Sequence, residues 1–562
     1  MMTRWYSRMV APLMGPLMAQ VCAVATLMAV PAVAADAGAP APKLIVLVSV
    51  DQFSTDLFQQ YRSHFTGGLR RLTEGAVFPN GYQSHAATET CPGHSTLMTG
   101  DHPARTGIIA NDWYSFKGPR PGKIYCAEDE SKGSYKAYVP SDVHLKVPTL
   151  GERMKAADPE VRTVSVAGKD RAAIMMGGHA VDELWFWKDG QGFISYEGRT
   201  APAAVTAVNE AAMAEIAKPA KEYAEPEWCK AIDMPVAVER KDDVLTVGNG
   251  RFARQPGPKA EAQWRASPAF DAAIVDLAVR LIKDMKLGHG KSVDVLTVGA
   301  SATDYIGHSY GTEGSEMCIQ VANLDRTLGK LVAALDATGV DYVLALSADH
   351  GGNDIPERER LRGMPMAARV DDGLVSENLG KKVAPLGVDG AELLFGGGNG
   401  DVWVGPTVAG SWRTKVVNEA LALYRADPQV AAVYTAAEVA AAPAPTGAPD
   451  AWSLLDRARA SFDPSRSGDL VVFLKPRITA IPSKPASYIA THGSPWDYDR
   501  RVPILFWRKG ITGFEQPLSV ETVDIMPTLA ALVGFKLALG DVDGRCLDLD
   551  GGSGDTCPVT AQ

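Results

Sequence analysis

The sequence predicts an α/β fold, a mainly parallel sheet with helices on both faces and additional inserted lobes. Short, mainly apolar runs typical of buried parallel strands alternate with longer segments of helical periodicity. Several runs end in polar or glycine-rich residues, and ligands bind at that edge of such a sheet. The predicted strands are Leu44–Val50, Thr163–Ala167, Val293–Val298, Tyr342–Leu346 and Val502–Phe506, and the predicted helices are Asp271–Met285, Met317–Leu335 and Val523–Val533.

The chain of 562 residues is too long for one simple core, so we expect one large domain with insertions. This domain is predicted to span residues 35–562, with insertions at about 180–265 and 355–485, where the patterning is less regular. The second insertion contains the glycine run Gly396–Gly400. That run lacks the Lys-Ser/Thr pair that completes a phosphate-binding loop, so it predicts a turn.

Residues 1–34 have the pattern of a secretory signal peptide. Arg4 and Arg8 precede a mainly apolar stretch, and the small residues at 32–34 permit cleavage before Ala35. A retained membrane anchor is the alternative, although prolines within the stretch disfavour it. No later segment is long and apolar enough to span a bilayer. We therefore expect a periplasmic or secreted protein without stable membrane insertion after cleavage.

Six cysteines would remain after cleavage, an even number that permits disulfides in an oxidising compartment. Fifteen connectivities are then open. Cys546 and Cys557 flank a Gly/Asp-rich tail segment and are the expected local pair. A bond between Cys91 and Cys126 is a second expectation.

The formal charge of −10 becomes about −12 without the signal segment, which holds two arginines and no acid. A net acidic chain without basic runs argues against nucleic acid as a main partner. Anionic substrates remain compatible with this charge, because bound metal ions can reverse the local field.

Aspartate and histidine recur near the ends of predicted strands, in a chain with only ten histidines. Together with one threonine, the set is Asp51, Thr90, Asp304, His308, Asp349, His350 and His492. Carboxylates and imidazoles beside a hydroxyl nucleophile suit two zinc ions about 4 Å apart that hydrolyse a phosphate ester. His492 alone would be taken for a surface histidine, so its inclusion depends on the rest of the set.

The other ligand candidates also have ordinary structural alternatives. Asp51 ends a predicted strand and can instead cap the following helix. Asp304 and His308 are four residues apart, so a helix places both on one face, where they bind a metal or only each other. Asp349 and His350 reach one ion only if the backbone turns there, which the following glycine pair permits.

Thr90 is the candidate nucleophile. Pro92 fits the first turn of a helix and would place Thr90 at or near its N-cap, where free N–H groups favour an anion. Metal coordination would activate its weakly acidic hydroxyl. A plain helix cap is the alternative. Thr88 and Ser95 are rival nucleophiles, Ser95 being expected inside the helix, and His94 is interpreted as structural.

Three further side chains are candidates for binding phosphoryl oxygens. Asn111 lies 21 residues after Thr90, and its amide can donate a hydrogen bond. Lys169 and Arg171 follow a predicted strand, where alternate residues would project two cations into one cleft. A monoester dianion carries more charge on its non-bridging oxygens than a diester, so fixed cations favour it. A solvated strand end is the alternative for the two cations.

The motifs resemble a known family. Thr90-Cys91-Pro92-Gly93-His94, Asp304-x-x-x-His308, Asp349-His350-Gly351 and Thr491-His492-Gly493 are similar to the alkaline phosphatase superfamily. They particularly resemble its threonine-nucleophile branch, which includes phosphate-irrepressible alkaline phosphatases and nucleotide pyrophosphatases/phosphodiesterases. The resemblance covers about residues 43–535 and implies an alkaline phosphatase-like fold. It also implies one zinc ion on Asp304, His308 and His492, and a second on Asp51, Asp349 and His350, with Thr90 bridging towards the phosphorus.

The Lys-x-Arg pair at 169–171 resembles the phosphate-irrepressible monoesterases, whereas phosphodiesterase relatives usually offer an apolar pocket for the second ester group. We therefore expect an exported alkaline phosphatase with two Zn²⁺ that hydrolyses small-molecule phosphate monoesters through a phosphothreonine at Thr90. A nucleotide pyrophosphatase/phosphodiesterase on the same scaffold is the main alternative. A phosphotransferase or mutase, and a non-catalytic phosphate- or metal-binding protein, are further alternatives.

Overall fold

The computed structural model describes residues 40–384, 389–552 and 554–557, and residues from Ala41 onward form one unit. The predicted signal segment, residues 1–34, lies outside the described residues. Within the part of the chain that is described, no helix has the length and apolar character needed to cross a membrane.

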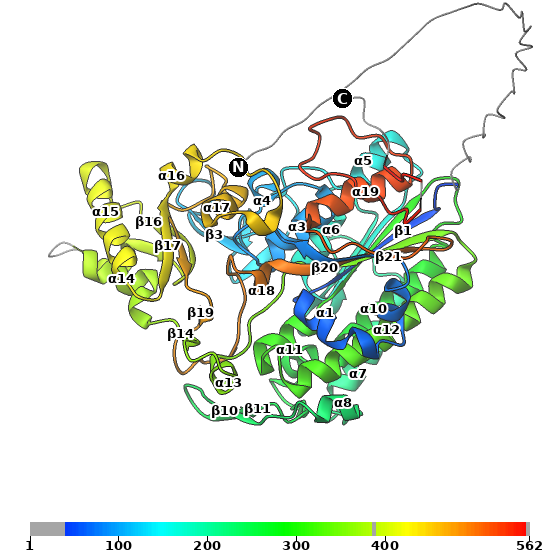
Figure 1. Ribbon diagram of the computed structural model, residues 1–562, viewed down its shortest axis with the longest axis horizontal. Helices are drawn as coiled ribbons and strands as arrows, with labels where there is room; N and C mark the ends of the chain where they lie inside the picture. Colours follow the sequence, from blue (N-terminus) through cyan, green and yellow to red (C-terminus); the bar gives the residue numbers. More distant parts are fainter. Residues whose placement is uncertain (1–39, 385–388, 553, 558–562) are drawn as a thin grey trace, which may run out of the picture. The chain divides into compact units, whose positions relative to one another are not determined.

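A ten-stranded sheet forms the core of the fold (Figure 1). Its strand order is β21-β2-β20-β13-β1-β12-β7-β8-β9, and β22 pairs with β2. The parallel centre comprises β13 (Tyr342–Ser347), β1 (Leu44–Val50), β12 (Asp294–Ala300), β7 (Thr163–Ala167) and β8 (Glu183–Lys188). The remaining strands are β20 (Arg501–Arg508), β2 (Ala76–Tyr82), β9 (Gly192–Ile194), β21 (Phe514–Glu515) and β22 (Val520–Glu521). The predicted α/β class with a mainly parallel sheet is therefore confirmed.

One predicted strand has the wrong direction. Val502–Phe506 was grouped with the parallel strands, but β20 pairs antiparallel with both β13 and β2. This segment is buried throughout, so its continuous apolar run looks like that of a parallel strand. Strand direction depends on how the chain connects, and an apolar run does not encode that.

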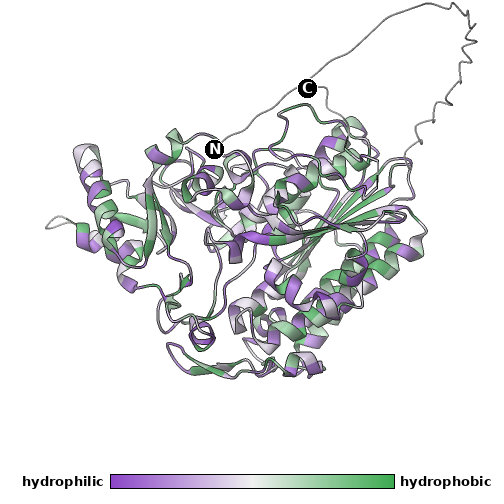
Figure 2. Ribbon diagram, in the orientation of Figure 1, coloured by the Kyte–Doolittle hydropathy of each residue, from purple (hydrophilic) through white to green (hydrophobic). Residues whose placement is uncertain are grey.

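Two hydrophobic clusters cover the two faces of the sheet. Along β1, Leu44, Val46 and Val48 belong to one cluster and Ile45 and Leu47 to the other, as the two-residue repeat of a strand requires. Figure 1 shows α10 (Pro268–Asp284) and α12 (Ser315–Thr338) on one face and α3 (Thr90–Thr99), α6 (Asp170–Gly177) and α19 (Ile525–Leu532) on the other. Figure 2 shows mainly hydrophobic strands and two-sided helices around them. Both faces are thus covered, as predicted.

The predicted helices correspond to helices of the structure. Their bounds are Pro268–Asp284 for α10, Ser315–Thr338 for α12 and Ile525–Leu532 for α19, the last preceded by a 3₁₀ turn at Thr522–Asp524. Pro268 occupies the first turn of α10, where its missing N–H costs nothing. Gly339 ends α12 in the left-handed conformation with φ 71°, which glycine adopts without steric cost.

A second, antiparallel sheet lies within the second predicted insertion. It contains β15 (Leu394–Gly396), β16 (Gly400–Val404), β18 (Leu470–Leu474) and β17 (Val430–Thr435) in that order. Helices α14 (Ser376–Val383) and α15 (Gly410–Ala426) pack on it through a separate hydrophobic cluster. The glycine run at 396–400 forms the turn of the β15–β16 hairpin, as predicted. The first predicted insertion includes β8 and β9 of the large sheet, and the limits of both insertions remain predictions.

Three disulfides join the six cysteines, namely Cys91–Cys126, Cys229–Cys318 and Cys546–Cys557. The first and third are the two expected pairs. The second bond ties α8 (Glu227–Lys230) to α12, far apart in sequence. Three disulfides are typical of proteins that fold in an oxidising compartment.

His102 fastens the C-terminal segment to the body of the fold. Its ring nitrogens lie 3.1 Å from Asp543 Oδ2 and 2.9 Å from Glu521 Oε1. Although burial opposes protonation, these two carboxylates raise the pKa of His102 to about 10. His102 is therefore a cation at neutral pH, held between two anions.

Candidate metal centre and active site

The candidate site residues gather at the carboxyl edge of neighbouring parallel strands. Asp51 follows β1, Lys169 follows β7, and Asp349 lies two residues beyond β13. Asp304 lies in the first turn of α11 (Ala302–Tyr310), which begins just after β12. The order β13-β1-β12-β7 makes these strands neighbours, so residues up to 298 positions apart in sequence meet at one edge.

The first candidate metal-ligating group consists of Asp304, His308 and His492. Their ligand atoms lie within 4.8 Å of one another. Nε2 of His308 and Nε2 of His492 are each 3.3 Å from Asp304 Oδ1. The four-residue spacing of Asp304 and His308 places both on one face of α11, as predicted.

The second group consists of Asp51, Asp349 and His350, and its ligand atoms also lie within 4.8 Å of one another. Nε2 of His350 is 3.4 Å from Asp51 Oδ1 and 3.2 Å from Asp349 Oδ2. All three side chains are fully buried. The structure thus brings together all six predicted aspartate and histidine ligands in the two predicted sets.

The glycine pair after His350 has a different reason from the expected one. Neither Gly351 nor Gly352 has a positive φ. Instead, a Cβ on Gly351 would lie 2.2 Å from the carbonyl oxygen of Tyr498. The close approach of the 498–499 backbone, whose carbonyls accept hydrogen bonds from both glycines, is what requires the missing side chain.

Each of the three histidines in these groups has its Nδ1 against a backbone carbonyl oxygen, which can only accept a hydrogen bond. The acceptors are Ala490 for His308 at 2.7 Å, Thr88 for His492 at 2.8 Å and Gly351 for His350 at 2.8 Å. This pattern assigns the proton of the neutral ring to Nδ1 and leaves Nε2 with a free lone pair. Such backbone contacts are the usual way in which a metal-binding histidine is oriented.

Asp349 is oriented by backbone groups. Its Oδ1 accepts hydrogen bonds from the N–H groups of Gln52 at 3.1 Å and His350 at 3.0 Å. Gln52 can reach it because its own backbone is left-handed, with φ 64°, which is rare outside glycine. Oδ2 of Asp349 therefore remains to face the other ligands.

Several buried polar atoms of these groups have no hydrogen-bond partner among the described residues. They include Oδ1 of Asp51, Oδ1 of Asp304, Oδ2 of Asp349 and Nε2 of His350. An unpaired buried acceptor is costly, and coordination to a divalent cation would satisfy it. Imidazole nitrogens and carboxylate oxygens are ligands of Zn²⁺. The residues therefore fit two metal sites.

Burial and charge give these ligands unusual protonation behaviour. Burial and the neighbouring Asp349 carboxylate raise the pKa of Asp51 well above its usual range. Burial lowers the pKa of His350 to about 3, so this ring is neutral, as a metal ligand must be. Burial alone would raise the pKa of Asp304, but the proximity of His308 and Lys169 holds this pKa well below its usual range.

Thr90 is the first residue of α3 (Thr90–Thr99), and Glu89 takes the N-cap position. Its hydroxyl oxygen lies 3.2 Å from Lys169 Nζ and 3.5 Å from Arg171 Nη2. Helix α3 packs directly against a metal-ligating segment, since a Cβ on Gly93 would lie 2.0 Å from the carbonyl oxygen of Asp349. The candidate nucleophile is thus fixed beside the second group and within reach of both cations.

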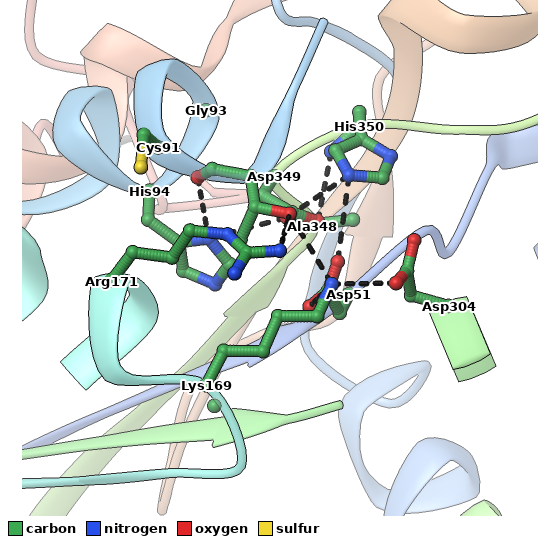
Figure 3. Close-up of polar contacts among 12 residues, drawn as sticks. Asp51, Cys91, Gly93, His94, Lys169, Arg171, Asp304, Ala348, Asp349 and His350 are labelled. Carbon is green, nitrogen blue, oxygen red and sulfur yellow. Dashed lines mark hydrogen bonds and ion pairs between the residues drawn. The ribbon is translucent and has the colours of Figure 1, made fainter. Parts of the chain in front are cut away.

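Lys169 occupies the N-cap position of α6 (Asp170–Gly177), and Arg171 lies in its first turn. The expected strand-like alternation is therefore wrong, because the helix begins directly after β7. Figure 3 shows the Lys169 side chain between two carboxylates, with Nζ 2.6 Å from Asp51 Oδ2 and 2.6 Å from Asp304 Oδ2. The helix start still directs Lys169 and Arg171 to the same hydroxyl.

Asn111 is held against the start of α3. Its Oδ1 accepts a hydrogen bond from the N–H of Cys91 at 2.8 Å, and its own N–H donates to Glu89 Oε2 at 2.6 Å. The Cys91–Cys126 disulfide lies in the same region, and the N–H of Cys126 donates a hydrogen bond to the Asn111 carbonyl at 2.9 Å. With its side-chain oxygen engaged, Asn111 presents its NH₂ group as the donor.

Two further side chains contact the site. His94, interpreted as structural, has its Nδ1 2.9 Å from the carbonyl oxygen of Thr90 and 3.2 Å from Asp349 Oδ2, so it positions the helix that carries Thr90 against a candidate ligand. Gln52 was missed by the sequence analysis, because no local pattern marks its left-handed backbone.

The comparisons with known proteins agree with this architecture. The family described as type I phosphodiesterase / nucleotide pyrophosphatase matches residues 45–495. The chain is 53% identical over 523 residues to alkaline phosphatase PhoK of Sphingomonas sp, covering 92% of each chain. It is 49% identical over 528 residues to alkaline phosphatase PhoD of Zymomonas mobilis subsp. mobilis, covering 92% of this chain and 90% of the relative. The solved structure of alkaline phosphatase PafA gives a TM-score of 0.77 at 24% identity, over 91% of this chain and 99% of that one.

Proposed function

This chain belongs to the type I phosphodiesterase / nucleotide pyrophosphatase family, and within that family we propose that it is an exported, metal-dependent alkaline phosphatase. Its substrates would be small-molecule phosphate monoesters. The convergence of Lys169 and Arg171 on the Thr90 hydroxyl carries this proposal, because two fixed cations suit the dianion of a monoester. The two relatives named alkaline phosphatases, at 53% and 49% identity, support the same activity.

Two divalent cations, which we take to be Zn²⁺, would be held by the two groups described above. The first set is Asp304, His308 and His492, and the second is Asp51, Asp349 and His350. When bound, two such ions stabilise negative charge on the entering and leaving oxygens of an in-line phosphoryl transfer. The unpaired buried acceptors in both sets support this assignment.

Thr90 would supply the nucleophile. Its Oγ1 loses its proton to solvent and forms a bond to phosphorus while the bond to the ester oxygen breaks; the ester oxygen takes up a proton from solvent, which gives a phosphothreonine and the free alcohol. Water then loses a proton and attacks this phosphorus, the bond to Oγ1 breaks, and Oγ1 is reprotonated, which frees Thr90 and inorganic phosphate. Lys169, 3.2 Å from Oγ1, stabilises the alkoxide form of the threonine. Lys169, Arg171 and the Asn111 amide bind the non-bridging oxygens in both steps.

Export is proposed from two features. Residues 1–34 have the pattern of a signal peptide. The described cysteines form three disulfides, a number that is rare in reducing compartments. We therefore place the mature enzyme in the periplasm or outside the cell.

The experiment that tests the activity compares a monoester and a diester of the same phenol on zinc-loaded mature protein. Phenyl phosphate should be hydrolysed with a much higher kcat/KM than methyl phenyl phosphate. A strong preference for the diester would instead assign the phosphodiesterase activity of the family. Release of inorganic phosphate without any added alcohol acceptor would exclude a phosphotransferase or mutase.

A further inference from the structure

A pocket of about 660 Å³ opens beside the candidate active site, and it is larger than a single phosphate group needs. Lys169, Arg171 and Asn111 line its inner end. The outer part is lined by Lys136, in the turn between β5 (Glu128–Ser134) and β6 (Ala137–Pro140), by Lys188 at the end of β8 and by Arg265 at the end of α9 (Ala260–Arg265). One cavity therefore contains two sets of cations.

Two carboxylates of the pocket lining, Asp112 and Asp170, accept hydrogen bonds from tyrosine hydroxyls. Asp170 accepts hydrogen bonds from Tyr125 at 2.7 Å and Tyr138 at 2.5 Å. Asp112 accepts a hydrogen bond from Tyr135 at 2.7 Å, and it also forms an ion pair with Lys123, which does not line this pocket. These hydrogen bonds leave both carboxylates charged, so the net positive charge of the pocket comes from number: its five cations face three carboxylates, Asp112, Asp170 and Asp189.

The outer cations are only partly neutralised. Lys136 and Lys188 are exposed, and neither side chain has a hydrogen bond or ion pair to another described residue. Arg265 pairs with Asp189 at 2.7 Å. Three cations and one carboxylate leave a net positive outer part in a protein whose formal charge is −10. A local field of this sign attracts anions.

Tyr305 connects the inner and outer sets. Lys169 Nζ lies 5.3 Å from the centre of its ring, and Arg265 Cζ lies 4.6 Å from the same centre. The two cations are therefore separated by no more than the sum of these distances. Tyr305 also follows Asp304 directly, so the outer set adjoins the first metal-ligating group. This spacing suits one small molecule with an anionic group at each end.

We propose that the outer part of this pocket, formed by Lys136, Lys188 and Arg265, binds a second anionic group of the substrate. The preferred substrates are then phosphate monoesters whose alcohol part carries a further phosphoryl or carboxylate group. This inference rests on the proposed phosphatase activity. Phosphoryl and carboxylate groups accept the same charge-assisted hydrogen bonds from lysine and arginine, so the pocket predicts an anionic group and does not distinguish between these two.

The test compares alkyl phosphates of two to five carbons that end in a phosphonate, a carboxylate or a neutral hydroxyl. The phosphonate cannot be hydrolysed as an ester, so each compound offers one reacting group. At its best chain length, the phosphonate-terminated ester should have a kcat/KM about tenfold above that of the hydroxyl-terminated ester, the effect of one charge-assisted contact. Added salt should reduce this preference.

The double variant Lys136→Gln/Lys188→Gln should bring the preference to within about twofold, since it removes both unpaired charges. Its kcat/KM for the hydroxyl-terminated ester should stay unchanged. The matched control is Lys291→Gln/Lys509→Gln, which changes the net charge equally. Lys291 precedes β12 and Lys509 follows β20, so both lie at the opposite edge of the sheet.

The outcomes separate the two proposals. A gain with the phosphonate alone assigns a second phosphoryl group, and a gain with both end groups assigns a general anion. No gain at any chain length, or an equal loss in the control variant, overturns this inference while leaving the phosphatase activity intact. Failure to hydrolyse even the hydroxyl-terminated esters overturns the proposed function itself.

Discussion

The two cations beside Thr90 allow a quantitative prediction. Arg171→Met and Lys169→Met, alone and together, should reduce the hydrolysis of a monoester much more than that of a diester. Arg171 is the cleaner of the two positions, because its side-chain contacts are to Thr90 and Tyr125 and not to any of the six candidate aspartate and histidine ligands. Methionine keeps most of the apolar length of either side chain while removing its charge.

The magnitude follows from the contacts. Lys169 is 3% exposed, so its charge is little screened by solvent. A hydrogen bond to a charged group contributes about 1.5–3 kcal/mol, so loss of two such groups should cost about 3–6 kcal/mol. This corresponds to a loss of roughly 10² to 10⁴ in kcat/KM for the monoester. A diester has one less charged oxygen to bind, so its loss should be smaller by at least about tenfold.

The assay is kcat/KM for phenyl phosphate and methyl phenyl phosphate with each variant, together with the zinc content per chain. Zinc content matters because Lys169 also contacts Asp51 and Asp304. Equal losses for monoester and diester, at unchanged zinc content, would refute the argument that these cations select the dianion. The single Arg171 variant should lose selectivity without losing metal.

Three other perturbations have expected results. Thr90→Ala should abolish trapping of a phosphoenzyme, whereas Thr90→Ser should retain it; label on another residue would contradict the assignment. Protonated His102 stabilises the fold, and this stabilisation is complete below the usual pKa of 6.5 and is lost as pH rises through about 10. Between these values, the contribution of His102 to the free energy of unfolding should fall by at most about 1.4 kcal/mol per pH unit. His102→Gln should flatten that slope in denaturant unfolding. The double variant Cys91→Ser/Cys126→Ser removes the disulfide that closes a loop of 35 residues, and it should lower the free energy of unfolding by about 4 kcal/mol. An unchanged midpoint of denaturant unfolding would argue against a stabilising role of this disulfide.

Most of the candidate ligand positions could be predicted because they are tied to local patterns. Asp51 directly ends an apolar strand, and Asp304 and His308 show the spacing of a helix face. Parallel strands place their carboxyl ends at one edge, so local predictions could be combined into one site. His492 could be placed only by resemblance, because no strand or helix pattern surrounds it.

Other features depend on contacts between distant parts of the chain. The direction of β20, the close approach of Tyr498 to Gly351 and the left-handed backbone of Gln52 leave no local signal. The outer cations of the pocket come from β6, β8 and α9 regions that look like ordinary solvated segments in sequence. Only their common lining of one cavity with Lys169 gives them a meaning.

The positions of the two inner cations imply different constraints on specificity. Lys169 contacts Thr90 and one carboxylate from each metal-ligating group, so any replacement changes the nucleophile and both groups together. Arg171 is supported separately, because Tyr125 lies 3.4 Å from its Nη1 and is itself held by Asp170. Preference for a monoester can therefore be altered at Arg171 without disturbing the metal ligands, whereas Lys169 couples substrate charge to the integrity of the whole site.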